Sequence, residues 1–333
     1  MHAGLIFCIP ALILRKAGTG FAHDALCFRQ APPSAFPLIA GHPMTLAHIS
    51  LSSRALSDHD LTRLLHEDAP HGDLTTRSLG ISDHPGQMTF RARGPQRLSC
   101  SEDAARLIEL AGATILSVRP SGSTLADQEE ILHAEGPAGA LLLAWKVAQT
   151  LLEYTAGIAS TTAALVAASR RPDGSGPLIA CTRKTFPGTR ALAARAVRDG
   201  GGIMHRLGLS ETILLFPEHT SFTDLTNAIG HLRAGAPEKR VVVEVGSLAS
   251  AQQAVHAGAD VLQLEKFSPP NVAEVTQWVS THAPRCIVAA AGGITPDNAA
   301  AYAAAGADVL VTSWPYFAPP RDVSVSITAK ASS

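Results

Sequence analysis

Cationic side chains gather around a triple glycine in the segment from Ala180 to Leu209. The segment contains Arg183, Lys184, Arg190, Arg195, Arg198 and Arg206, and Asp199 is its one acidic residue. A solvated helix surface usually carries charges of both signs. The excess of positive charge therefore indicates a place where anions bind, and the rest of the sequence must show which anions these are.

Arg195 and Arg198 are expected to play a different part from the other cations. They lie three residues apart beside an apolar stripe that runs from Leu192 to Val197. This spacing predicts a single amphipathic helix. We expect both arginines on its solvent-exposed face or at a contact between subunits.

The second half of the chain is predicted to contain short apolar strands that alternate with helices, as in a parallel sheet buried on both faces. These strands are Leu178–Cys181, Ile213–Phe216, Val241–Val245, Val261–Leu264, Ile287–Ala290 and Val309–Val311. The sequence Ala-Gly-Ala-Asp-Val-Leu begins at Ala257 and again at Ala305, and each copy joins a helix end to a strand start. Such repetition favours a (β/α) barrel over an open sheet.

In such a barrel, side chains at the carboxyl ends of the strands meet on one rim. The residues that the sequence places there are Thr182, Arg183, Lys184, Glu244, Glu265, Ala291, Gly292, Gly293, Thr312 and Ser313. A glycine loop that leads into a helix commonly binds phosphate. Two carboxylates opposite such a loop suit Mg²⁺ that is partly held by substrate phosphates.

Each of these motifs has an alternative interpretation. The two glycines could form a simple tight turn, and the two glutamates could be structural partners of Lys184 or Lys266. His205 and Arg206 precede their predicted strand at Ile213–Phe216 and do not follow it. The argument from strand ends therefore does not place them in the site.

Composition restricts the class of protein. The 333 residues are 46% hydrophobic and carry a formal net charge of −1, which suits a packed α/β protein without nucleic acid or membrane as a partner. The five cysteines are scattered and form no C-x-x-C pair, so we expect a reduced, cytoplasmic chain without a zinc site. Residues 1–43 are expected to be an unstructured leader, with Met44 as the start of the folded chain.

The region before residue 157 predicts a different architecture. Helices are predicted at Asp58–His66, Glu102–Ala111 and Ala138–Tyr154, and strands at Gln87–Ala92, Thr114–Val118 and Glu130–Ala134. Strands and helices that are segregated in this way indicate an α+β layer domain. We therefore expect one domain over residues 44–157 and the barrel over residues 158–320.

Four motifs are similar to those of the quinolinate phosphoribosyltransferases, also called nicotinate-nucleotide pyrophosphorylases. They are Thr182–Gly188, Gly200–Leu209, Val243–Val245 and Ala291–Ile294, and their order and spacing match from about Asp58 to Ile327. Further segments resemble the ModD subgroup, pyrophosphorylases that are associated with molybdenum transport. These segments are Trp145-Lys146, Leu264–Phe267, Ala289–Gly293, and Val311–Ser313 followed by Pro315-Tyr316.

The resemblance implies a fold and a reaction. The fold is an N-terminal α/β sandwich plus an incomplete (β/α) barrel of the type II phosphoribosyltransferase kind, with residues 322–327 returning as a strand to the sandwich. The reaction transfers a phosphoribosyl group from phosphoribosyl pyrophosphate to a ring nitrogen of quinolinate or a related small aromatic acid, with Mg²⁺ as cofactor. The resemblance also implies a homodimer with the active site at the interface.

The resemblance also implies roles for individual residues. Glu244 and Glu265 would bind Mg²⁺ and ribose and act in catalysis with Lys184. The acceptor would contact Thr182, Arg183, Lys184, His205, Arg206, Phe216 and, from the other subunit, Lys146. The 5′-phosphate would lie against Ala291, Gly292, Gly293, Thr312 and Ser313.

Two positions depart from the family in the half of the site that holds the acceptor. Phe216 stands where the family carries a lysine, and Lys146 replaces an arginine. Three hypotheses stay open. The acceptor could differ from quinolinate, it could be quinolinate in NAD synthesis with Phe216 tolerated, or the chain could bind an oxyanion such as molybdate without turnover.

Overall fold

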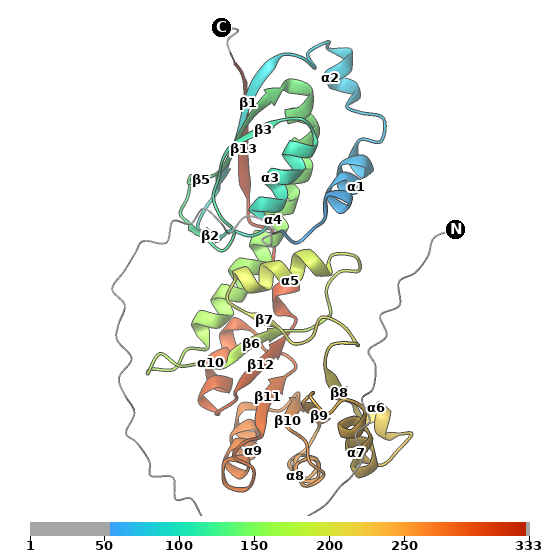
Figure 1. Ribbon diagram of the computed structural model, residues 1–333. Coiled ribbons are helices and arrows are strands. Elements are labelled where there is room, and N and C mark those ends of the chain that lie inside the picture. Colours follow the sequence, from blue (N-terminus) through green and yellow to red (C-terminus); the bar gives the residue numbers. More distant parts are fainter. Residues whose placement is uncertain (1–53, 331–333) are drawn as a thin grey trace, which may run out of the picture. The chain divides into compact units, whose positions relative to one another are not determined.

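The computed structural model describes residues 54–330, which belong to one compact unit (Figure 1). The expected leader, residues 1–43, and the expected start at Met44 lie outside the described residues. Two sheets organise the described chain. One is antiparallel and includes the last strand of the chain, and the other is parallel and carries the cation-rich segment.

The antiparallel sheet has the strand order β13-β1-β5-β3. Its strands are β1 (Pro85–Ala92), β3 (Thr114–Val118), β5 (Glu130–Pro137) and β13 (Val323–Ala329), and a small ribbon pairs β2 (Gln96–Arg97) with β4 (Thr124–Leu125). Alternate β1 residues Met88, Phe90 and Ala92 are buried, because successive strand residues face opposite sides of a sheet. They share a core with buried residues of α1 (Asp58–Asp68), α3 (Ser101–Leu110) and α4 (Ala138–Ala168), while α2 (Leu74–Ser78) is a short turn of helix.

The parallel sheet has seven strands in the order β7-β6-β12-β11-β10-β9-β8. The strands are β6 (Leu178–Cys181), β7 (Ile203–Met204), β8 (Ile213–Leu215), β9 (Val241–Val245), β10 (Val261–Glu265), β11 (Ile287–Ala291) and β12 (Val309–Thr312). β7 and β8 follow each other in the chain but lie at opposite edges of the sheet. The predicted architecture, a sandwich plus an incomplete barrel, is confirmed.

The helices between the barrel strands begin at residues that favour a helix start. Ser247, Asp224 and Ser268 each accept a hydrogen bond from a backbone N–H of the first turn. The helices are α5 (Arg190–Asp199), α6 (Pro217–Thr220), α7 (Leu225–Gly235), α8 (Leu248–His256), α9 (Pro269–His282), α10 (Pro296–Ala304) and the 3₁₀ turn η1 (Trp314–Phe317). Their apolar sides and the outer face of the sheet form the second core.

Helix α4 is longer than its predicted end at Tyr154 and contacts both sheets (Figure 1). The expected domain boundary at residue 157 therefore lies inside a helix. Gly157 lies inside this helix, where the absence of a side chain lets another segment approach closely. A Cβ at this position would lie 2.5 Å from the carbonyl oxygen of Pro319. By length and composition the helix could span a membrane, but 44% of its most apolar stretch of 18 residues is buried inside the protein.

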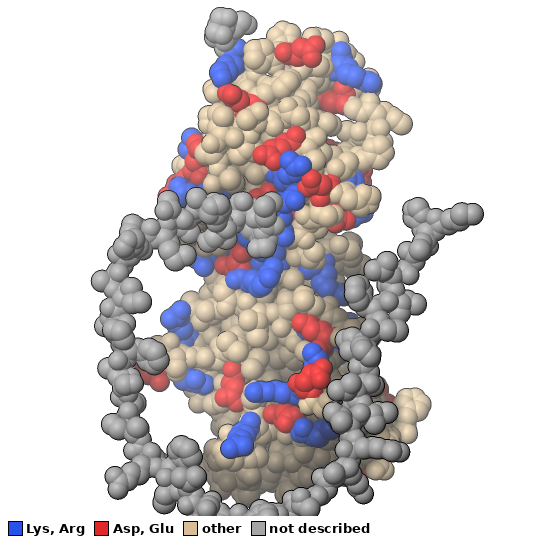
Figure 2. Space-filling view, viewed as in Figure 1, with Lys and Arg blue, Asp and Glu red and all other residues tan. Residues whose placement is uncertain are grey.

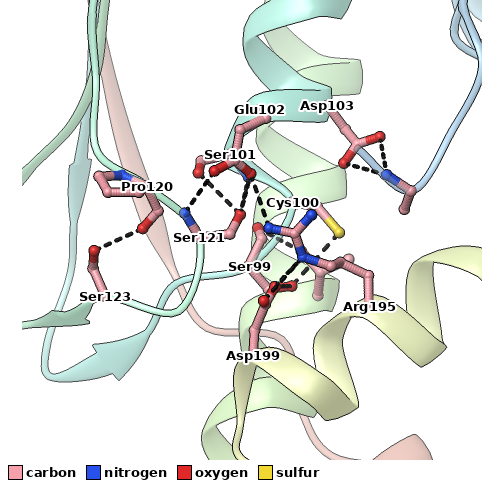
Figure 3. A network of polar contacts seen from close by, with 12 residues as sticks. Ser99, Cys100, Ser101, Glu102, Asp103, Pro120, Ser121, Ser123, Arg195 and Asp199 are labelled. Atoms are coloured by element: carbon pink, nitrogen blue, oxygen red, sulfur yellow. Dashed lines mark hydrogen bonds and ion pairs between the residues drawn. The ribbon is translucent and has the colours of Figure 1, made fainter. Parts of the chain in front are cut away.

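A polar network joins α5 of the barrel to α3 of the sandwich (Figure 3). Arg195 Nε lies 2.9 Å from Asp199 Oδ1, and Arg195 Nη2 lies 3.3 Å from Glu102 Oε2. The Ser99 hydroxyl donates to Asp199 Oδ2 at 2.6 Å. The expectation that Arg195 faces solvent is wrong, because its side chain is only 11% exposed and is paired within the chain. Arg198, on the same helix, is exposed as expected.

Candidate active site

A cavity of about 590 Å³ lies at the carboxyl ends of the barrel strands. Every site residue predicted from the sequence lines it except Lys146: Thr182, Arg183, Lys184, His205, Arg206, Phe216, Glu244, Glu265, Ala291, Gly292, Gly293, Thr312 and Ser313. These residues come from the ends of all seven strands of the parallel sheet. The cavity therefore brings together cations, carboxylates and a glycine loop.

Small side chains inside the barrel leave room for this cavity. Ala180, Ala289, Ala291 and Val311 form a separate buried cluster on neighbouring strands. A barrel interior is usually filled by bulky branched side chains. Here alanines take such positions, so the upper layer of the barrel stays open for a ligand.

Arg206 is the most deeply placed cation of the cavity. Its side chain belongs to a residue that is 7% exposed, and among residues 54–330 no hydrogen bond or ion pair from the protein reaches its guanidinium. Burial, and then the neighbouring charge of Arg183, lowers the pKa of Arg206. A desolvated cation without an internal partner is costly, so this end of the cavity suits an anionic ligand.

The structure corrects the placement of His205 and Arg206. They were not expected at a strand end, but the short strand β7 ends at Met204 and pairs in parallel with β6, so both residues follow a strand like the other site residues. Burial, and then the charge of Arg206, lowers the pKa of His205 below its usual 6.5. We infer that the imidazole is neutral at pH 7.

Phe216 lies against Arg206 at the cationic end. The guanidinium carbon of Arg206 is 5.4 Å from the centroid of the Phe216 ring, a cation–π contact. The Phe216 ring also stacks on the imidazole of His219 with a centroid separation of 5.9 Å. The aromatic ring is thus held between neighbours and is part of the wall beside Arg206.

Glu244 and Glu265 form the acidic side of the cavity. Gln263 Nε2 donates to Glu244 Oε2 at 2.6 Å, since the two residues lie opposite each other on the parallel strands β10 and β9. Burial, and then the charge of Glu265, raises the pKa of Glu244, and the bond from Gln263 opposes this shift. Two carboxylates that share one site in this way attract cations or the hydroxyl groups of a sugar.

The glycine loop after β11 allows two strand ends to approach each other. Gly292 and Gly293 have φ values of +90° and +72°, which favour glycine. A Cβ on Gly292 would lie 2.9 Å from Lys266 Cγ and 3.2 Å from Glu265 Oε1. The loop leads directly into α10, whose N-terminus favours a phosphate group.

Thr312 and Ser313 differ in what their hydroxyl groups do. The Thr312 hydroxyl donates to the Ile294 carbonyl at 2.8 Å and accepts from the Trp314 amide at 3.0 Å. It therefore holds the glycine loop in place, and its hydroxyl is already satisfied. Ser313 lines the cavity and is half-buried.

Lys146 lies away from this cavity. It projects from α4, where its Nζ is 3.1 Å from Gln149 Oε1 and 4.3 Å from the centroid of the Trp145 ring. It lines a second hollow of about 800 Å³, which is largely apolar and includes the exposed rings of Tyr154 and Phe186. Within one chain, Lys146 does not join the other predicted site residues.

The donor set fits a magnesium ion only in part. Within residues 54–330 no group of three or more His, Cys, Asp or Glu side chains is placed to hold a metal. Glu244 and Glu265 supply two carboxylates, and Mg²⁺ usually binds one or two carboxylates plus water and substrate phosphates. These two residues would therefore hold Mg²⁺ together with a phosphorylated substrate.

Two domain profiles match nearly all of the described chain. The profile of the quinolinate phosphoribosyl transferase N-terminal domain matches residues 73–156, and that of the C-terminal domain matches residues 158–326. The chain belongs to the quinolinate phosphoribosyltransferase family. Members of this family are pentosyltransferases, and the chain is an enzyme of this class.

Relatives of the family match over most of their length. The ModD protein of Rhodobacter capsulatus is 49% identical over 248 residues, which is 74% of this chain and 95% of the relative. Human nicotinate-nucleotide pyrophosphorylase (carboxylating) is 31% identical over 269 residues, which is 80% of this chain and 90% of the relative. The crystal structure of NadC from Streptococcus pyogenes superposes with a TM-score of 0.75 at 28% identity and covers 82% of this chain and 96% of that one.

Three residues of the cavity region were not assigned a role from the sequence. Gln263 carries the bond to Glu244, and a buried glutamine in an apolar strand is the signal that could have revealed it. Tyr316 donates its hydroxyl to the Thr182 carbonyl at 2.7 Å and so fixes the loop that carries Arg183. Glu218 follows Phe216 and lines the cavity with an exposed side chain.

Proposed function

We propose that this enzyme transfers a phosphoribosyl group from phosphoribosyl pyrophosphate to a ring nitrogen of quinolinate or a related aromatic acid. The bond between C1 of the ribose and the pyrophosphate oxygen breaks, pyrophosphate leaves with the electron pair, and the ring nitrogen bonds to C1. One observation carries the proposal. A single cavity combines two arginines at one end, which form no ion pair among residues 54–330, with a carboxylate pair and a phosphate-type glycine loop at the other.

The donor would occupy the acidic and glycine-rich side of the cavity. Gly292, Gly293 and the N-terminus of α10 would hold the 5′-phosphate, for which the helix dipole and backbone N–H groups are suited. Glu244 and Glu265 would face the ribose. As the bond to pyrophosphate breaks, C1 becomes positively charged, and carboxylates fixed nearby stabilise that charge more than they stabilise the ground state.

Mg²⁺ would bind at Glu244 and Glu265 and neutralise charge on the departing pyrophosphate. The exposed Lys184 reaches the same cavity and would assist with this charge. Neither group has to form a covalent bond with the substrate. The catalytic power of such a site lies in the placement of charges before the reaction begins.

The acceptor would lie at the cationic end, between Arg183 and Arg206. Neutral His205 can offer one hydrogen bond donor and one acceptor to the ring or its substituents. Quinolinate carries two carboxylates, so it can serve as the acceptor in NAD synthesis only if this end of the cavity binds both of them. The observed wall of Phe216 and Glu218 favours an acceptor other than quinolinate.

We also propose that the enzyme works in the cytoplasm as a homodimer, without nucleic acid or membrane as a partner. The hollow around Lys146 offers an apolar surface for a second copy, whose barrel cavity Lys146 would complete. On the face in Figure 2, basic and acidic side chains are interspersed. Such a surface does not favour strong binding to a polyanion.

An oxyanion-binding protein without turnover is the second candidate. The guanidinium groups of Arg183 and Arg206 would bind molybdate as well as a carboxylate. Glu218, Glu244 and Glu265 line the same cavity, and three carboxylates oppose the binding of a small dianion. The donor site would also serve no purpose in such a protein.

The experiment that tests the proposal measures pyrophosphate release from the purified full chain with Mg²⁺ and phosphoribosyl pyrophosphate. A panel of pyridine mono- and dicarboxylates, including quinolinate, is compared with a blank that lacks an acid. We expect release that depends on at least one acid of the panel. Failure to bind phosphoribosyl pyrophosphate, together with tight binding of molybdate, would overturn the transferase in favour of the oxyanion-binding protein.

A further inference from the structure

The acceptor end of the cavity is closed by a contact between the two edges of the parallel sheet. Arg206 follows β7 at one edge, and Phe216 follows β8 at the other. The distance of 5.4 Å between the guanidinium carbon and the ring centroid therefore spans the open side of the barrel. Leu214, the buried residue of β8 that also lines the cavity, continues the same wall.

This contact holds Arg206 without neutralising it. An aromatic ring attracts a cation through its quadrupole and removes no charge, whereas a carboxylate partner would cancel it. The pKa of Arg206 is lowered in part by Arg183, which means that two positive charges lie close together at this end. One anionic group placed between the two guanidinium groups satisfies both, and it can do so by bidentate hydrogen bonds.

A negative charge borders this anion site. Glu218 follows Phe216 and Pro217 in the chain, and its side chain lines the cavity. Its charge is near enough to raise the pKa of Glu244. His205 does not compensate, because burial lowers the pKa of its imidazole and so favours the neutral form. Within one chain, Arg183 and Arg206 thus offer two cations for one anionic group at this end, while Lys184, whose charge acts on Glu244, is assigned to the pyrophosphate. Glu218 presents a carboxylate to any further substituent.

From this arrangement, and resting on the proposed phosphoribosyl transfer, we infer the chemical class of the acceptor. It is a flat heteroaromatic acid with a single carboxylate, which Arg183 and Arg206 bind against the wall of Leu214 and Phe216. The edge that faces Glu218 carries hydrogen or an N–H donor. Among the residues of one chain, a second carboxylate is repelled by Glu218 and finds no cation at Phe216.

The test is a calorimetric titration of the full chain with pyridine-3-carboxylate and with pyridine-2,3-dicarboxylate. Phosphoribosyl pyrophosphate with Mg²⁺ is titrated separately. We expect the monocarboxylate to bind about fivefold more tightly, the factor that one fully hydrated like-charge contact supplies. Glu218→Gln should tighten binding of the dicarboxylate by about the same factor and change the affinity for the monocarboxylate by a smaller factor. Phe216→Lys should reverse the preference.

Matched controls separate a local effect from a change of charge. Glu274→Gln on the exposed outer side of α9 changes the same charge, and Phe222→Lys places the same lysine at a ring that is 93% exposed outside the cavity. Both should leave the two affinities unchanged. Melting temperatures show whether each variant is folded.

The inference would be overturned by tighter binding of the dicarboxylate to the unaltered chain, or by no gain for the dicarboxylate in Glu218→Gln. If phosphoribosyl pyrophosphate binds but neither acid does, the inference about the acceptor is also overturned, whereas the proposed donor site is retained. If the acids bind as expected but phosphoribosyl pyrophosphate does not, the proposed transfer is wrong and the single-anion site remains.

Discussion

Glu244 is the residue on which the proposed reaction should depend most strongly. It is held at 2.6 Å by Gln263 on the inner side of the barrel and lies near Glu265. Glu244→Gln keeps the size of the side chain and removes the charge. We expect acid-dependent pyrophosphate release to fall by roughly 100-fold or more, the effect of removing one preorganised electrostatic group.

The fold should tolerate this change, because relieving the repulsion from Glu265 offsets the altered bond to Gln263. The melting temperature of Glu244→Gln should therefore stay within about 2 °C of the unaltered chain. The measurements are initial rates with saturating Mg²⁺ and a thermal scan. Retained turnover would remove Glu244 from the reaction.

Sequence reasoning found most of this site at the residue scale because its motifs place unusual residues after apolar strands. Arg183, Glu265 and Gly292 follow short strands that are mostly apolar, so their position on the rim could be predicted. A glutamine in an apolar strand marks Gln263 in the sequence, but its bond to Glu244 could not be predicted, because it depends on the register between neighbouring strands. Pairing between strands is a tertiary property, and a single sequence does not specify it directly.

At the scale of elements, α5 is fixed to the sandwich by an ion network that the sequence does not reveal. Arg195 lies between Asp199 of its own helix and Glu102 of α3, with all three side chains at 21% exposure or less. The strand β7 was hidden for a similar reason, since two residues after three glycines give no periodic pattern. Contacts between distant segments decided both cases.

Arg195→Met should destabilise the protein by about 2–4 kcal/mol, because two largely buried carboxylates lose their partner. Arg198→Met makes the same substitution on the exposed side of the same helix and should change stability by less than about 0.5 kcal/mol. Urea unfolding of both variants measures the difference. Equal values would mean that the network contributes nothing to the free energy of unfolding.

The glycines after α5 set how closely this helix approaches α4. A Cβ on Gly200 would lie 2.5 Å from the Ala159 carbonyl oxygen and 2.6 Å from Thr162 Cβ. Gly200→Ala should therefore cost about 2–3 kcal/mol, since backbone has to move. Gly230→Ala in α7 meets nothing within 4 Å and should instead stabilise by about 0.5–1 kcal/mol through helix propensity. Thermal and urea unfolding of the two variants should shift in opposite directions.

At the scale of the whole molecule, the position of Lys146 is the strongest argument for a shared site. Lys146 is exposed on α4 and lines a hollow that shares no residue with the barrel cavity. The acceptor contact proposed for Lys146 would therefore require a second copy of the chain. The exposed rings of Tyr154 and Phe186 beside it are surfaces that dimer formation would bury.

Mixing two inactive variants tests this arrangement directly. In a symmetric dimer whose sites each draw on both subunits, Lys146→Ala and Glu244→Gln place their defects in different halves of a site. Mixed dimers then contain one site with both defects and one with neither, so random exchange of equal amounts should restore about one quarter of the sites. Glu265→Gln mixed with Glu244→Gln is the control, because both defects come from the barrel half and no site is intact. Recovery of pyrophosphate release in the first mixture alone supports the shared site, whereas no recovery despite exchange of subunits confines each site to one chain.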